Sequence, residues 1–147
     1  MIAVVSACSS SAPDDVRTFD ACAPVRLDVD TPTDARLAGI DTAIAAWQAL
    51  GVTTFSRDAV TDETIAIQFA DASPAEYGLF EGNAIAINVE LAGDELAITI
   101  AHELGHAVGL VHIDPAVRSS VMNPGNLVVD PTSDDRDAIA ALWGSCH

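Results

Sequence analysis

The stretch "HELGHAVGLVH", from His102 to His112, holds three of the four histidines in the chain. Residues four apart lie on one face of an α-helix, so His102 and His106 can direct ring nitrogens at one point about 2 Å from each. This is the spacing of two zinc ligands. His112 would face elsewhere if the helix continued. The spacing therefore predicts a helix that ends before His112.

Gly109 is the residue at which this helix can end, because glycine adopts the left-handed conformation found after helix C-termini. The chain can then turn back and supply His112 as a third ligand. Three protein nitrogens leave one coordination position open, which is typical of catalytic zinc sites. We therefore expect one catalytic Zn²⁺ on His102, His106 and His112, with Glu103 as the general base. The alternative is an accidental pattern on a solvated helix surface.

The full spacing H-E-x-x-H-x-x-G-x-x-H is the signature of the metzincin zinc proteases, and from residue 22 to 146 the chain resembles their matrixin branch, the matrix metalloproteinases. "SVMNP" stands where matrixins have their Met-turn, and "DDRDAIAALWG" (134–144) is similar to their C-terminal helix. The resemblance implies that Met122 packs beneath the metal. Pro124 stands where the astacin and serralysin branches have a metal-contacting tyrosine, which favours matrixins.

The chain departs from the matrixin pattern in its supply of histidines. A second, structural zinc would need further histidines, and only His147 remains, so we expect none and a short connection between Ala70 and Ala84. Calcium stays open, because aspartates are plentiful but no EF-hand spacing occurs. No segment matches the family's pro-segment cysteine motif.

Hydrophobic periodicity predicts the order of the elements. We expect an α+β domain with an α/β-type start: a metzincin-like, or zincin-like, small twisted and mostly parallel sheet with an antiparallel edge strand, and three helices. A turn at residues 81–83 would join two adjacent short strands. The expected strands are 25–30, 53–58, 64–70, 76–80 and 84–91; the expected helices lie within 31–51, 95–109 and 134–144, capped by Thr33 or Asp34, by Asp94 and by Ser133.

The resemblance also implies how a substrate would be held. Metzincins bind an extended peptide along an exposed sheet edge, here residues 75–80, with Gly78 and Leu79 beside the peptide backbone. The opposite wall would come from the loop after the Met-turn. We expect it to accept a medium or large hydrophobic residue just after the cleaved bond, through Asn123, Gly125 and Leu127.

Length and charge restrict the class of protein. A chain of 147 residues, half of them hydrophobic, can bury one core, so we expect a single domain over residues 22–147. The formal charge of −16 would repel nucleic acid. A polypeptide substrate is compatible with it, although the acidity also fits a solvated surface with no role in selectivity. We expect a monomer.

Residues 1–21 resemble a truncated export signal followed by a Ser-rich tether. "VSAC" is similar to the lipobox of bacterial lipoproteins, with Cys8 as the lipidated residue. We therefore expect a bacterial protein that is exported and either secreted or lipid-anchored to a membrane at the cell surface or periplasm. The alternative is a tail with an inert thiol. If Cys8 is lipidated or removed, Cys22 and Cys146 remain as a disulfide pair or as two buried thiols.

These observations favour a zinc-dependent endopeptidase. The alternative is a catalytically silent metal-binding or adhesive surface lipoprotein on the same scaffold. The presence of Glu103 gives that alternative little support, because a silent scaffold has no need of a general base at this offset.

Overall fold

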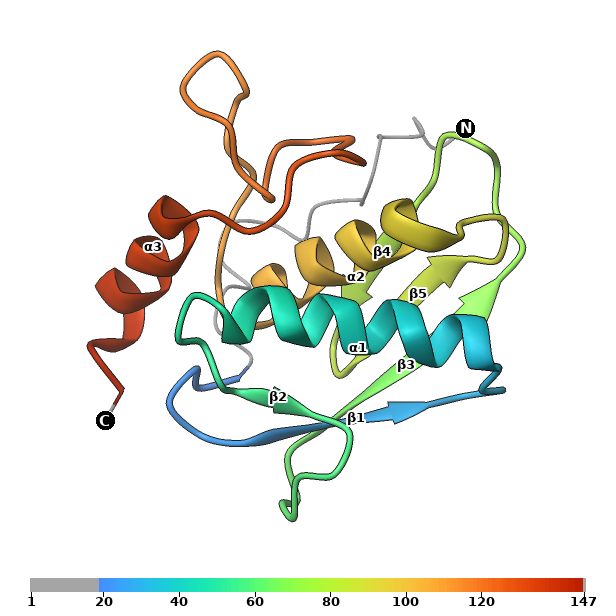
Figure 1. The fold of residues 1–147 in the computed structure, drawn as a ribbon, viewed down its shortest axis with the longest axis horizontal. Helices are drawn as coiled ribbons and strands as arrows, with labels where there is room; N and C mark the ends of the chain where they lie inside the picture. Colours follow the sequence, from blue (N-terminus) through green and yellow to red (C-terminus); the bar gives the residue numbers. More distant parts are fainter. Residues whose placement is uncertain (1–18, 147) are drawn as a thin grey trace.

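A computed structural model describes residues 19–146, so Cys8 and most of the signal-like stretch lie outside the described residues. Five strands form one sheet in the order β2-β1-β3-β5-β4, accompanied by three helices (Figure 1). The strands are β1 (Val25–Val29), β2 (Phe55–Ser56), β3 (Thr64–Ala70), β4 (Gly78–Glu81) and β5 (Ala84–Asn88); the helices are α1 (Asp34–Gln48), α2 (Gly93–Ala107) and α3 (Ser133–Trp143).

The sheet is parallel except at one edge. β1 pairs in parallel with β2 and β3, β3 pairs in parallel with β5, and β4 runs antiparallel to β5. Gly82 has a φ of 64°, which suits the tight turn joining these last two strands. The expected mostly parallel sheet with an antiparallel edge strand is therefore confirmed.

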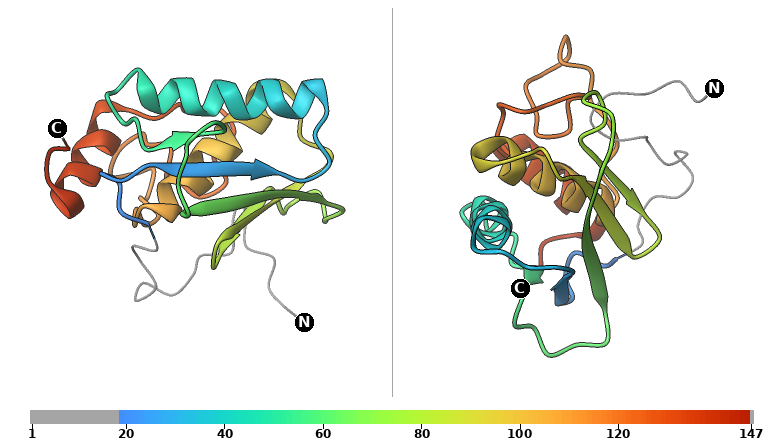
Figure 2. Two further views of the ribbon diagram at one scale, coloured as in Figure 1. Left: turned by 90° about the horizontal axis from the view of Figure 1, so that it is seen from below. Right: turned by 90° about the vertical axis from the view of Figure 1, so that its right-hand side faces the viewer.

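Helices α1 and α2 lie side by side on the same face of the sheet (Figure 2). Alternate residues of β3, Ile65 and Ile67, are fully buried, as expected for a strand with one covered face. The buried Trp47 of α1 donates from Nε1 to the carbonyl oxygen of Ala101 in α2, at 3.1 Å. This bond fastens α2 to α1 at the residue that precedes His102.

The helix caps differ in part from those expected. Thr33 caps α1 by accepting from the amide of Arg36, as one of the two expected residues. Asp94 was expected to cap α2 and does not, because the helix begins earlier, at Gly93 after Ala92, without a side-chain cap bond. Asp94 instead lies in the first turn, where a carboxylate favours the helix dipole.

The cap of α3 is Thr132 and not Ser133. Thr132 accepts from the amide of Asp135, and Asp135 accepts in return from the amide of Thr132, which makes a capping box. The reciprocal pair satisfies two amides that Ser133, one position later, could not reach with the same partner.

The strands also begin and end differently from the expected ones. β2 is only two residues long, and β4 begins at Gly78 and not at residue 76. The buried Asn88 explains the late start of β4, because its Nδ2 donates to the carbonyl oxygens of Ser73 and Glu76 at 3.1 and 2.8 Å. These bonds hold the segment before β4 as a loop.

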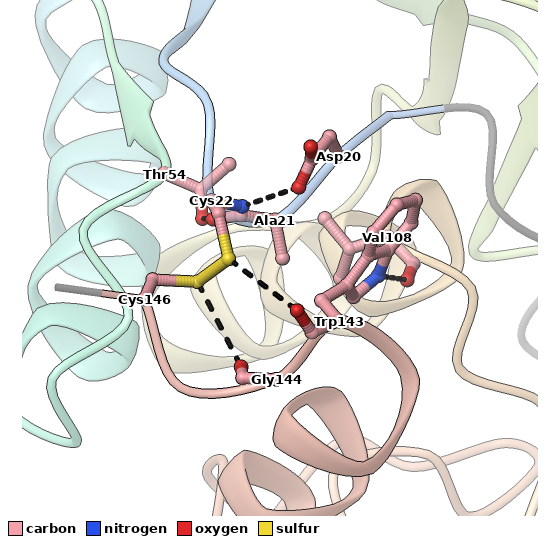
Figure 3. The surroundings of a disulfide bond; sticks show 8 residues. All are labelled: Asp20, Ala21, Cys22, Thr54, Val108, Trp143, Gly144 and Cys146. Atoms are coloured by element: carbon pink, nitrogen blue, oxygen red, sulfur yellow. Dashed lines mark hydrogen bonds between the residues drawn. A yellow bond between two sulfur atoms is a disulfide. The ribbon is translucent and has the colours of Figure 1, made fainter.

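A disulfide between Cys22 and Cys146 joins the segment before β1 to the segment after α3 (Figure 3). Close to it, Trp143 donates from Nε1 to the carbonyl oxygen of Val108 at 2.7 Å, which ties α3 to the C-terminal end of α2 (Figure 3). No helix within residues 19–146 is long and apolar enough to cross a membrane.

We expect removal of this disulfide to destabilise the protein. The two cysteines are 124 positions apart, and opening so large a loop should lower the free energy of unfolding by about 3 to 5 kcal/mol. Chemical denaturation of Cys22→Ser and of Cys146→Ser, with Cys8→Ser as the matched control, measures this loss. Equal stability of all three variants would contradict the expectation.

Candidate metal centre

The chain reverses its direction at the C-terminal end of α2, so that the segment carrying His112 comes back toward the histidines of the helix. Gly109 has a φ of 103°, in the left-handed region. Its amide donates to the carbonyl oxygen of His106 at 3.0 Å, and the amide of Leu110 donates to that of Gly105 at 2.9 Å. These two bonds form a Schellman motif. The helix therefore ends at Ala107, with Gly109 at the C′ position that the sequence predicts, and His112 follows after the chain has turned.

Two of the three imidazoles are oriented by backbone carbonyl groups. Nδ1 of His102 lies 2.6 Å from the carbonyl oxygen of Val121, and Nδ1 of His106 lies 2.7 Å from that of Leu110. A carbonyl oxygen can only accept, so each Nδ1 carries the proton and each Nε2 keeps a lone pair. Both rings are thus fixed in the tautomer that binds a metal through Nε2.

The nitrogen atoms converge at a spacing that fits zinc. Nε2 of His102 lies 3.3 Å from Nε2 of His112, and the ligand atoms of all three histidines lie within 4.8 Å of one another. Two ligands at about 2.0 to 2.1 Å from a tetrahedral zinc ion lie about 3.3 Å apart. Within the described part of the chain, these histidines are the only such group of three metal-binding side chains. The donor set fits a zinc ion.

Burial keeps the three imidazoles neutral at pH 7. Loss of solvation, with a smaller effect of His106, lowers the pKa of His102 to about 3. Burial likewise lowers the pKa of His106 to about 4, and it lowers the pKa of His112. Neutral imidazole is the form that binds a metal. Protons therefore compete little with a metal ion at neutral pH.

Glu103 is fully buried between α2 and the edge strand. It follows His102 on the helix and lies against β4, since a Cβ atom placed on Gly78 would come 3.1 Å from its Oε1. The carboxylate is therefore on the side of α2 that faces the antiparallel strand.

Met122 packs against α2 at Gly105, which lies between His102 and His106 in the sequence. A Cβ atom placed on Gly105 would lie 2.6 Å from the Met122 sulfur, so a side chain there would require Met122 to shift. The Met122 carbonyl oxygen also accepts from the amide of Ile113 at 3.0 Å, next to His112. The turn around Met122 is thus in contact with both α2 and the segment that carries the third histidine.

The fully buried carboxylate of Asp135 holds this turn in place. It accepts from the hydroxyl of Ser120, from the amide of Val121 at 3.0 Å and from Arg118 at 2.9 Å. Burial alone would raise the pKa of Asp135, but the bonds from Ser120, Arg118 and two amides outweigh it, and the pKa is lowered. Asp135 therefore fixes the carbonyl of Val121, which in turn orients His102.

The residues expected to bind substrate lie in β4 and in the loop after Met122. Gly78 and Leu79 are half-buried in β4. In the loop after the Met-turn, Pro124 is exposed and Gly125 and Leu127 are half-buried. Asn123 is buried, and its Nδ2 donates to the carbonyl oxygens of Ile113 and Arg118 at 2.8 and 3.0 Å, so its amide holds the loop together.

Sequence reasoning missed two polar residues that build this loop. Asp135 lies in the segment expected to form the last helix and was given no role of its own, although the T-x-x-D spacing from Thr132 is a capping-box signal. Asn126 is buried, donates to the carbonyl oxygen of Val129 at 2.7 Å and accepts from the amides of Val128 and Val129. An asparagine next to glycine gives only a general turn signal, which does not specify these partners.

Comparison with known proteins identifies two solved structures with a similar fold. No family model matches the sequence. The structure is similar to a crystal structure of myroilysin, with a TM-score of 0.65 and 13% sequence identity over 96% of this chain and 92% of that chain. A second structure of myroilysin gives a TM-score of 0.62, also at 13% identity, over 95% and 91% of the two chains. The protein thus has a fold similar to that of myroilysin, and its three clustered histidines are able to hold a metal ion.

We expect Asp135→Asn to destabilise the fold strongly. The amide would place a donor among groups that all donate to the carboxylate, so the free energy of unfolding should fall by about 2 to 4 kcal/mol. Chemical denaturation at pH 7 measures the loss, with the exposed Asp134→Asn as the matched control.

The loss of stability caused by Asp135→Asn should depend on pH. Because the pKa of Asp135 is lowered in the folded protein, its stabilisation is present above the unfolded pKa of about 4 and is lost as the pH falls further. The difference in stability between the parent and Asp135→Asn should therefore shrink below about pH 4. A difference that stays constant down to pH 2 would contradict this assignment.

Proposed function

We propose that this protein is a zinc-dependent endopeptidase that cleaves peptide bonds with Glu103 as the general base. One observation carries the proposal: three neutral imidazoles converge on one point, two of them with their Nδ1 protons bound to backbone carbonyls, and the buried Glu103 follows His102 on α2. This arrangement suits a catalytic metal site with three protein ligands and an open position. The metalloprotease-like fold supports it.

The proposed role of each residue follows from its position. His102, His106 and His112 would hold the zinc ion, which when bound supplies a Lewis acid for the scissile carbonyl and lowers the pKa of a coordinated water. Glu103 would accept a proton from the attacking water at its carboxylate and pass it to the leaving amine. The burial of Glu103 excludes bulk water from this proton transfer.

The substrate would lie along β4. This strand is an edge of the sheet, pairs only with β5 among the strands, and packs against α2 on the side of Glu103. An extended peptide can pair with such an edge through main-chain hydrogen bonds. The loop of residues 123–130 would form the opposite wall. We propose that it accepts a hydrophobic residue after the cleaved bond, with Gly125 and Leu127 at the wall.

The proposal includes the matrixin type and export of the protein. The contact of Met122 with α2 at Gly105, between His102 and His106 in the sequence, and Pro124 two positions after Met122 support the matrixin assignment. The disulfide between Cys22 and Cys146 is compatible with an oxidising compartment outside the cytosol. Attachment of a lipid at Cys8 remains a prediction on a residue outside the described part of the chain.

The first test is metal content. We expect one zinc ion per chain by elemental analysis, and loss of that ion in His102→Ala, His106→Ala or His112→Ala. His147→Ala, which removes the fourth histidine, is the matched control and should retain the metal. Two tightly held zinc ions per chain, or full zinc content in the triad variants, would contradict the assignment.

The second test removes the general base. Glu103→Ala should keep the fold and the zinc ion, since no ligand changes, but lose nearly all cleavage of a mixed peptide pool, because proton transfer contributes about 10²- to 10⁴-fold to such reactions. Parallel assays of the parent with and without a zinc chelator establish the metal dependence. If the parent cleaves no peptide, the proposed function is wrong, and cleavage by Glu103→Ala at the parent rate would contradict only the mechanism.

A further inference from the structure

A glycine of the edge strand lies directly against the proposed general base. Gly78 is the first residue of β4 and pairs with Ile87 of β5. A Cβ atom placed on Gly78 would lie 3.1 Å from Oε1 and 3.2 Å from Cγ of Glu103, and 3.0 Å from Cγ2 of Thr99. These distances are shorter than ordinary van der Waals contacts. A methyl group at this position would therefore push against Glu103 and Thr99.

The reason for glycine at this position is space and not backbone conformation. Gly78 is not among the residues of the described chain with a positive φ, so alanine could adopt its backbone geometry. The turn glycine Gly82 of the same hairpin has a φ of 64° and open space around it. The two glycines thus serve different purposes. Only Gly78 is required for the close approach of β4 to α2.

The groups around Gly78 have little freedom to move away. Thr99 and Glu103 are one helical turn apart on the same face of α2, and they are 2% and 0% exposed. Two further contacts hold α2, namely the bond from Trp47 to Ala101 and the close contact of Leu96 with Gly39. A side chain at position 78 would therefore displace the Glu103 carboxylate, the edge strand, or both.

We propose that Gly78 is a positioning residue that fixes the carboxylate of Glu103 by letting β4 close against it. This inference rests on the proposed endopeptidase function, in which Glu103 transfers the proton. It differs from the sequence-based expectation, in which Gly78 leaves room for the backbone of the substrate. In the structure the absence of a side chain at Gly78 lets β4 approach Thr99 and Glu103.

The two roles of Gly78 predict different kinetic effects. If Gly78 positions Glu103, Gly78→Ala misplaces the proton acceptor, and kcat should fall about tenfold or more while KM changes little, since an error of about 1 Å can cost about a hundredfold in rate. If Gly78 instead admits the substrate backbone, KM should rise and kcat should stay near the parent value. The zinc content should be unchanged in either case, because no ligand is touched.

A double-mutant cycle in stability tests the contact without relying on activity. We would measure the free energy of unfolding of the zinc-loaded parent, Gly78→Ala, Glu103→Ala and the double variant. Removing the Glu103 side chain makes room for the new methyl group, so Gly78→Ala should destabilise the Glu103→Ala background less than it destabilises the parent. Additive effects would overturn the proposal.

The control for the cycle is Gly39→Ala, which crowds α2 at Leu96, seven positions before Glu103. A Cβ atom on Gly39 would lie 2.7 Å from Leu96 Cδ2, far along the helix from Glu103, so its effect should be the same in the parent and in Glu103→Ala. If Gly78→Ala is too unstable to measure, the cycle is run in a Thr99→Ser chain, which removes the contact to Thr99 Cγ2 and keeps the contact to Glu103. Coupling must persist there, and its absence would also overturn the proposal.

The outcomes separate this inference from the proposed function. A parent protein without peptidase activity would refute the function, while the stability cycle would still decide whether Gly78 and Glu103 are in contact. An active parent whose Gly78→Ala variant has a raised KM and an unchanged kcat would refute the positioning role and leave the function intact. A lowered kcat together with coupling in the cycle would support both.

Discussion

The hydrogen bond from His102 Nδ1 to the carbonyl oxygen of Val121 is the interaction on which the site depends. Two histidines on one helix turn can point at a common atom, but their rings rotate unless a partner holds the second nitrogen. The partners here are carbonyls of irregular backbone, Val121 and Leu110. Such carbonyls keep a fixed direction only if their own segments are held. The polar residues of the loop and of α3, Asp135 above all, meet that need.

The need to hold the metal-binding side chains in fixed directions also explains how closely the elements around α2 pack. Three close contacts of α2 involve a glycine, which has no side chain. They are at Gly39, where α1 approaches, at Gly78, where the edge strand approaches, and at Gly105, where Met122 packs. Each glycine brings a neighbouring element within contact distance of the helix that carries the ligands. The bond from Trp47 to Ala101 adds a directional constraint on the α1 side. As a result α2 is surrounded by packed elements, and this packing limits the motion of the helix and of the imidazoles that it carries.

The spacing of neighbouring residues was enough to predict the three histidines of the site. The features that the sequence did not predict depend on contacts between residues far apart in the chain. The HExxHxxGxxH pattern lies within one helix and one turn, so the sequence indicates both the convergence of the histidines and the end of α2 at Gly109. The start of β4 depends on Asn88, 12 and 15 positions from its partners, which no local pattern shows. The role of Asp135 depends on Ser120 and Val121, 15 and 14 positions away. The Thr132 cap was within reach of sequence reasoning, because its partner lies three positions on.

The charge of the orienting groups also bears on the proposed chemistry. The chain has 22 acidic residues, yet His102 and His106 are oriented by neutral carbonyl oxygens. A carboxylate in that position would raise the basicity of the imidazole and pass negative charge toward the metal. Asp135 acts one bond further away, through the backbone of Val121, and its charge is balanced by Arg118. Three neutral ligands, two of them with neutral partners, would leave a zinc ion most of its positive charge. In the proposed reaction that charge would polarise the peptide carbonyl, and the proton transfer would fall to the carboxylate of Glu103.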